Sequence, residues 1–184
     1  DVILEPLEAA VISVFGEVNV PGQYPLISNE ENLLSLINRA GGFTDNALKN
    51  GVQIFREADT KGFNTIKTKD SESAPDKSSR FQVAWENFQI PLMPGDSIIV
   101  KKTTRTVNII GEVFNPGIIE IKSGRGVSYY IDQAGGKTPL ADPNGIIIVY
   151  ANGRVKPKTF FNNPKVSDGS TIVVNAREII EPFD

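Results

Sequence analysis

The sequence predicts an α+β fold in which two tandem modules each pack a mixed β-sheet on one helix. Three observations predict this fold. A set of short motifs occurs twice in the same order, each copy holds runs rich in Val and Ile between glycines and prolines, and each holds one apolar stripe with helical spacing. The 184 residues are enough for two small domains with separate cores.

The internal repeat is the strongest of these observations. Gly16-Glu17-Val18 returns as Gly111-Glu112-Val113. Three more pairs of motifs follow in the same order: Pro21-Gly22 with Pro116-Gly117, Ala40-Gly41-Gly42 with Ala134-Gly135-Gly136, and Gly95-Asp96-Ser97-Ile98-Ile99-Val100 with Gly169-Ser170-Thr171-Ile172-Val173-Val174. Because the matched motifs keep their order, they indicate a duplication.

The repeat divides the chain into parts. Residues 10–101 form the first module, with a polar insertion at about 57–80, and residues 102–175 form the second, followed by a tail at 176–184. The insertion is rich in Lys, Asp, Ser and Glu, and an extended hairpin loop is favoured over a contact loop because long surface loops cost little stability. Residues 1–9 predict the closing strand of a preceding module and a linker, and therefore a longer protein.

Each module is expected to begin with a hairpin. The first strand is predicted at Val11–Val18 and again at Val107–Val113, both rich in Val and Ile. A Pro-Gly turn follows, since Pro supplies a fixed φ and Gly a positive one. The second strand is predicted at Gln23–Leu26 and Ile118–Ile121.

A helix comes next in each copy. In the first copy Ser28 or Asn29 is expected to cap it, with Glu30 and Glu31 in the first turn. The glycine pair that follows each stripe is typical of a helix end. The apolar stripes are Leu33, Leu34, Leu36, Ile37 and Ala40 in one copy and Val127, Tyr130, Ile131 and Ala134 in the other.

Further strands complete each module. Asn152-Gly153 predicts a tight hairpin, and Pro157 predicts that the strand after it lies at a sheet edge. This order, in which two strands precede a helix and further strands follow it, is that of a β-grasp fold. Residues 101–106 are expected to link the two copies. The predicted strands are Val52–Arg56 and Ser97–Val100 in the first copy, and Ile146–Tyr150, Val155–Phe160 and Thr171–Val174 in the second.

The repeated turn motifs, the apolar helix ending in Ala-Gly-Gly and the closing strand together resemble the soluble-ligand-binding β-grasp (SLBB) domain. The second copy departs from this pattern at Asp168, at Ser170 and in a more polar helix start. Tandem SLBB domains resemble the periplasmic part of polysaccharide export outer-membrane proteins. That resemblance implies polysaccharide as a partner, self-association into a ring, an inner-membrane export partner, and a place on the periplasmic side of the outer membrane.

Composition excludes several classes of function. The chain has no Cys and no His, so it offers no thiolate nucleophile, no zinc site of the usual ligands and no imidazole for proton transfer. Its net charge of −3, with scattered Lys and Arg, argues against nucleic acid as a partner. No apolar run is long enough to span a membrane. We expect no catalytic, cofactor or metal site, and no enzyme.

Few side chains are candidates for a site. Glu17 and Glu112 recur at one point of the first strand, but they lie in separate modules, and a repeated structural contact or a subunit contact is favoured over paired catalysis. If the ligand is a sugar, Trp85 and Tyr129 are the candidates for carbohydrate binding, although Trp85 in the alternating run Phe81-Val83-Trp85 is more typical of a sheet core. Tyr130 is expected in the core.

Three classes of function remain open at this point. The first is a non-catalytic scaffold in a capsular or exopolysaccharide export channel. The second is a soluble carbohydrate-binding accessory protein of capsule assembly. The third is a subunit of a redox complex, which the resemblance also allows but which lacks the expected cysteine-ligated clusters and nucleotide signature.

Overall fold

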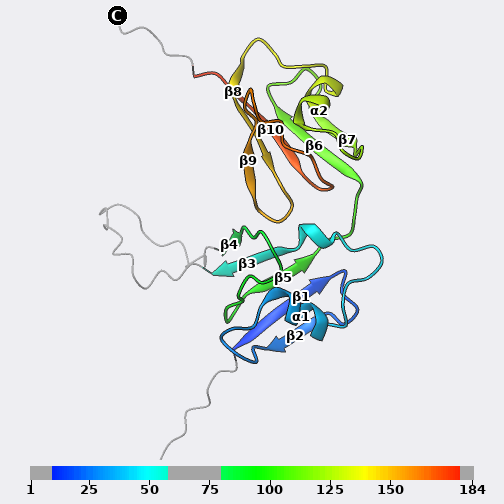
Figure 1. Cartoon of the computed structure of the whole chain (residues 1–184), viewed down its shortest axis with the longest axis vertical. Helices are drawn as coiled ribbons and strands as arrows, with labels where there is room; N and C mark the ends of the chain where they lie inside the picture. Colours follow the sequence, from blue (N-terminus) through cyan, green and yellow to red (C-terminus); the bar gives the residue numbers. More distant parts are fainter. Residues whose placement is uncertain (1–9, 58–79, 179–184) are drawn as a thin grey trace, which may run out of the picture.

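The computed structural model describes residues 10–57 and 80–178, which fold into two modules joined by a short linker (Figure 1). Module 1, residues 10–100, contains β1 (Val11–Gly16), β2 (Gly22–Pro25), α1 (Leu33–Arg39), η1 (Lys49–Gly51), β3 (Gln53–Glu57), β4 (Arg80–Val83) and β5 (Ser97–Val100). Module 2, residues 106–176, contains β6 (Thr106–Gly111), β7 (Gly117–Glu120), α2 (Val127–Gln133), β8 (Ala141–Val149), β9 (Val155–Pro157) and β10 (Thr171–Ala176).

Each module has one mixed five-stranded sheet, with the order β2-β1-β5-β3-β4 in one and β7-β6-β10-β8-β9 in the other. The central pairs β1–β5 and β6–β10 are parallel, and the other neighbours are antiparallel. A parallel pair needs a crossover connection, and the helix lies within that crossover. The predicted α+β fold of two tandem modules is confirmed.

Each module buries its own core between the sheet and the helix. Alternate residues of the first strand, Ile12 and Val14 in β1, have no exposed surface and meet the buried stripe of α1. Tyr130 of α2 is also fully buried, as predicted, and its hydroxyl both accepts from the Lys122 amide and donates to the Lys122 carbonyl. Two separate cores are therefore present, one in each module.

The repeated Gly-Glu-Val motif has a steric origin at its glycine. Gly16 ends β1 with a φ of +87°, and Gly111 ends β6 with a φ of +88°. A Cβ on Gly16 would lie 2.0 Å from the carbonyl oxygen of Val100, and one on Gly111 would lie 2.1 Å from that of Val174. Only glycine combines this backbone conformation with so close an approach.

The start of α1 differs from the prediction. The helix begins at Leu33, and Asn32 is its cap, with its side-chain oxygen accepting from the Ser35 amide at 3.0 Å. Ser28 instead closes the preceding turn, where its carbonyl oxygen accepts from the Glu31 amide. Glu31 therefore precedes the helix, where it is buried and forms an ion pair. Ser28, Asn29, Glu30 and Glu31 all stand before the helix rather than in it.

The second helix takes its cap from elsewhere in the chain. Its N-cap residue is Gly126, and the side-chain oxygen of Asn163 accepts from the Ser128 amide at 3.1 Å. A Cβ on Gly126 would lie within 2.6 Å of the Asn163 side chain. Gly126 thus makes room for a cap that arrives from the loop after β9.

Several strand limits differ from the prediction, and β4 was not among the strands predicted for the first copy. β8 begins at Ala141, before the predicted 146–150, and β9 ends at Pro157, before the predicted end at Phe160. β9 does lie at the edge of its sheet, as Pro157 predicts. The predicted strand in residues 1–9, the insertion between Glu57 and Arg80, and the end of the tail lie outside the described residues.

Candidate functional site at the module junction

The turn of the β8–β9 hairpin rests on module 1 (Figure 1). Asn152, at the tip of this turn, is only 9% exposed, and its side-chain amide donates to the Trp85 carbonyl oxygen at 2.8 Å. The Gln82 side chain donates in the opposite direction, to the Ala151 carbonyl oxygen at 2.9 Å. Two hydrogen bonds, one donated by each module, therefore join the modules.

The sequence around this turn explains the close approach. Gly153 has a φ of +83°, and the β8–β9 pairing confirms the hairpin that Asn152-Gly153 predicts. A Cβ on Gly51 of module 1 would lie 2.8 Å from the Cβ of Ala151. Small residues on both sides let the turn reach the backbone of module 1.

The linker, residues 101–105, is fastened first to module 1. The Leu48 amide donates to the Lys101 carbonyl oxygen at 2.7 Å, and the Thr103 amide donates to the Asn46 carbonyl oxygen at 2.8 Å. The linker therefore continues β5 along the loop that precedes η1.

Asp168 fastens the same linker to module 2. Its carboxylate accepts hydrogen bonds from the Thr103 and Thr104 hydroxyls and from the Thr106 amide. Burial by itself would raise the pKa of Asp168, but these bonds, with one from the Arg105 amide, outweigh burial and lower that pKa below its ordinary value of 3.8. The linker is thus held on both sides.

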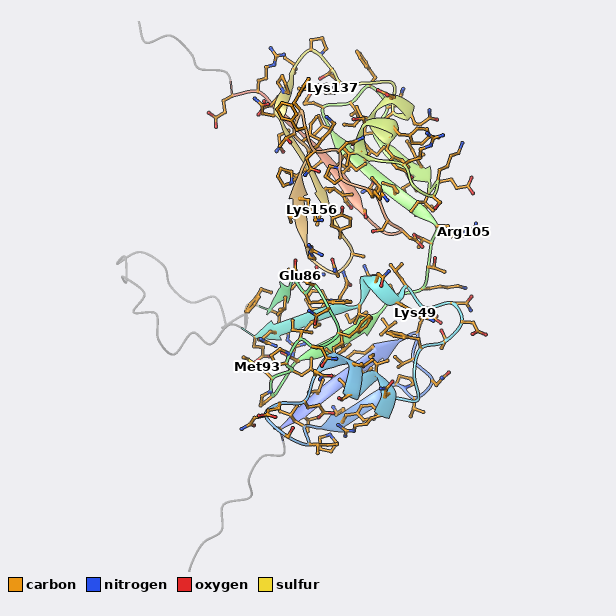
Figure 2. All side chains as sticks on the ribbon, viewed as in Figure 1. Lys49, Glu86, Met93, Arg105, Lys137 and Lys156 are labelled. Atoms are coloured by element: carbon orange, nitrogen blue, oxygen red, sulfur yellow. The ribbon has the colours of Figure 1, made fainter. Side chains whose placement is uncertain are left out.

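An ion pair adds little to this junction. Arg154 lies 2.9 Å from Glu86, but the Glu86 side chain is 75% exposed. Exposed pairs of this kind contribute about 0–1 kcal/mol. Figure 2 shows Glu86 at the edge of module 1 that faces the hairpin, with Lys156 farther along that hairpin. The two hydrogen bonds and the held linker, rather than this pair, fix the contact.

Two cavities lie beside the hairpin turn. One, of about 300 Å³, lies where the hairpin meets the end of β4, and the other, of about 280 Å³, includes Lys101, Lys102 and Thr171. The first is lined by Asn50, Trp85, Glu86, Tyr150, Asn152, Arg154, Lys156 and Ser167. Amides, hydroxyls, two cations and one carboxylate suit a polyhydroxylated ligand with some negative charge.

Tyr150 forms one wall of the first cavity. Its hydroxyl donates to the Lys165 carbonyl oxygen at 2.8 Å, which holds the ring against the second module. Burial raises the pKa of Tyr150, and the nearby Arg154 partly offsets that rise. The phenol is therefore protonated at neutral pH and offers a flat face, not a charge.

The two predicted sugar-binding residues lie apart. Trp85 lines the first cavity, but it is only 4% exposed, and its indole nitrogen donates to the Val52 carbonyl oxygen at 2.7 Å. Tyr129 is half-buried on α2, where its ring packs edge-on against Tyr130 and lies 5.0 Å from the Arg125 guanidinium. Trp85 thus offers the junction mainly its backbone carbonyl, and Tyr129 is not among the residues that line either cavity.

The alternating run before Trp85 does not share one buried face. β4 ends at Val83, so Trp85 follows the strand instead of lying in it, and Phe81 is 48% exposed. The prediction of a single buried face was therefore wrong at Phe81. The residues that build the junction, Gln82 and Asn152 above all, were not predicted as site residues, and only the Asn-Gly hairpin signal marked their neighbourhood.

The recurring glutamates make a repeated structural contact, one of the two interpretations favoured for them. The Glu17 carboxylate accepts from the Thr44 hydroxyl, and the Glu112 carboxylate accepts from the Thr138 hydroxyl at 2.5 Å. The threonine amides also donate to the carbonyl oxygens of the same glutamates. Each pair ties the end of the first strand to the segment after the helix.

Two further observations concern what the described residues lack. Within residues 10–57 and 80–178, no helix combines the length and the apolar character that crossing a membrane requires. In the same ranges, no cluster of three or more carboxylate, imidazole or thiol side chains is placed to hold a metal ion.

Comparison with known families agrees with this architecture. Residues 10–100 match one model described as the SLBB domain, and residues 106–156 match a second model with the same description. A search of curated proteins found no significant match. The chain belongs to the SLBB family and carries two of its domains in tandem.

The structure extends the second match, because β10 completes the sheet beyond residue 156. SLBB domains are non-catalytic ligand-binding domains that occur in polysaccharide export proteins, which supports a general ligand-binding role for this chain.

Proposed function

We propose that this chain is the periplasmic segment of a capsular or exopolysaccharide export protein, on the periplasmic side of the outer membrane. Its two modules act there as a non-catalytic scaffold in an oligomeric channel through which the polysaccharide passes. The observation that carries this proposal is the pair of SLBB domains in tandem. An inner-membrane export protein is the expected partner.

The held junction supports the scaffold role. A wall built from repeated segments needs a constant angle between neighbouring modules, because small variations at each joint would prevent closure of a ring. Here the linker is bonded on both sides and the β8–β9 turn bonds directly to module 1. Such a segment keeps its shape without help from a neighbouring subunit.

Light scattering after size exclusion tests the proposal on the full-length protein. The expected result is a closed oligomer of one size. A full-length protein that stays monomeric at all accessible concentrations would contradict the channel model.

A second candidate function is a soluble carbohydrate-binding accessory protein of capsule assembly. The cavity of about 300 Å³ favours it, because Tyr150 offers a flat wall and Arg154 and Lys156 offer cations. Titration of capsular oligosaccharides by NMR tests this candidate, with shifts expected around Tyr150 and Ser167. Lys156→Gln should weaken binding, whereas Lys122→Gln, beside Tyr129, is the matched control. Shifts around Tyr129 alone would contradict a junction site.

A further inference from the structure

The loop that follows β9 exposes two adjacent phenylalanines. Phe160 is 93% exposed and Phe161 is 96% exposed, and their rings pack edge-on with centroids 5.1 Å apart. Neither ring belongs to the core of module 2. Single exposed apolar residues are ordinary on a protein surface, but a contiguous pair of bare aromatic rings marks an interaction site.

The loop is held in this outward conformation. The Thr159 amide donates to the Asn162 carbonyl oxygen at 2.9 Å, and the Asn162 amide donates to the Thr159 hydroxyl at 3.1 Å. The Lys158 amide bonds to β8, and Asn163 caps α2. These bonds anchor the loop at its base and on both sides, with the two rings at its tip.

The fold does not require aromatic residues to point outward here. The matching segment of module 1 follows β4, and the Leu33 amide there donates to the Ile90 carbonyl oxygen as Val127 donates to Pro164 in module 2. In module 1 the aromatic residues turn inward: Trp85 is buried, and Phe88 packs on it with ring centroids 4.9 Å apart.

The charge of the residues around the loop indicates which kind of partner the two rings contact. Residues 155–166 contain three lysines and no Asp or Glu, although the whole chain has a net charge of −3. Lys158 lines a small surface cavity that also includes Asp132 of α2, and Lys165, on the other side of the tip, is exposed. Aromatic rings at a tip with lysines around its base match the boundary of an anionic lipid bilayer.

We propose that the loop at 158–164 inserts Phe160 and Phe161 into the interface of an anionic lipid bilayer, while Lys158 and Lys165, which flank the tip, contact the headgroups. The rings supply the apolar contact, and the lysines supply an attraction that salt weakens. This places module 2 against a membrane surface.

Vesicle co-sedimentation of the 184-residue chain tests the proposal. One set of vesicles contains phosphatidylcholine with phosphatidylglycerol, and the other contains phosphatidylcholine alone. We expect binding to the anionic vesicles that falls as salt rises. Removing both rings in Phe160→Ser/Phe161→Ser should lower the partition coefficient by about tenfold or more, because each buried phenylalanine contributes that order of affinity.

Matched variants separate insertion from general stickiness. Ile118→Ser/Leu140→Ser removes two other exposed apolar side chains of module 2 and should leave binding unchanged. Lys165→Glu should weaken binding by about fivefold or more at low salt. Equal binding of the Phe160→Ser/Phe161→Ser variant and the unaltered chain would overturn the proposal. So would absence of vesicle binding, including the case in which the Phe pair instead drives self-association without lipid.

Discussion

Gly16→Ala should destabilise module 1 more than Gly42→Ala. Both glycines have a positive φ, +87° and +84°, so either alanine carries the strain of a left-handed backbone, about 1–2 kcal/mol. A Cβ at Gly16 would also lie 2.0 Å from the Val100 carbonyl oxygen, whereas nothing lies within 4 Å of one at Gly42. Relieving that overlap moves β1 against β5 and adds about 1–3 kcal/mol.

Urea denaturation followed by tryptophan fluorescence measures this difference. The chain has one Trp, and Trp85 is buried in the core of module 1, so its emission reports on the unfolding of that module. We expect a loss of about 1–2 kcal/mol for Gly42→Ala and about 2–5 kcal/mol for Gly16→Ala. Equal losses would refute the steric account. Gly111→Ala against Gly136→Ala repeats the comparison in module 2 by amide exchange.

Three other predictions concern the junction and a helix cap. Asn152→Ala leaves the buried Trp85 carbonyl oxygen without its donor and should weaken the contact between the modules by about 1–3 kcal/mol. Arg154→Ala removes only an exposed ion pair and should cost less than about 1 kcal/mol. Urea denaturation of the two single variants compares their free energies of unfolding. The pKa of Asp168 is lower in the folded state than its ordinary value of 3.8, so the ionised carboxylate stabilises the fold above that value. This stability is lost as the pH falls through the folded pKa. In urea titrations at several pH values, Asp168→Asn should therefore reduce the fall in the free energy of unfolding on the acid side. Asn163→Ala should cost about 1 kcal/mol through loss of the α2 cap, measured by circular dichroism on denaturation.

Sequence reasoning found the features that depend on local chemistry. Glycines with a positive φ, the apolar helix stripe and the alternating strands all leave marks within a few residues, and the duplication made each mark visible twice. The succession of strands and helix along each module followed from these marks. The edge position of β9 followed from Pro157.

Features that depend on distant contacts left no such mark. Asn163 caps α2 by accepting from the Ser128 amide, 35 positions away in the sequence. The hydrogen bond from Asn152 to Trp85 joins residues 67 positions apart. Ser28 and Asn29 have the right chemistry for a cap, but the turn that closes on Ser28 delays the helix to Leu33. Trp85 lies beyond the end of β4, so alternation along that strand does not determine its environment.

A scaffold depends on a constant angle at this junction, so the two modules must be fixed to each other. Residual dipolar couplings of backbone amides, measured separately for residues 10–57 and 106–176, report the orientation of each module. If the modules are fixed, one common alignment tensor fits both of them in their present orientation. Two tensors of different magnitude would show that the modules move independently and would overturn the fixed junction.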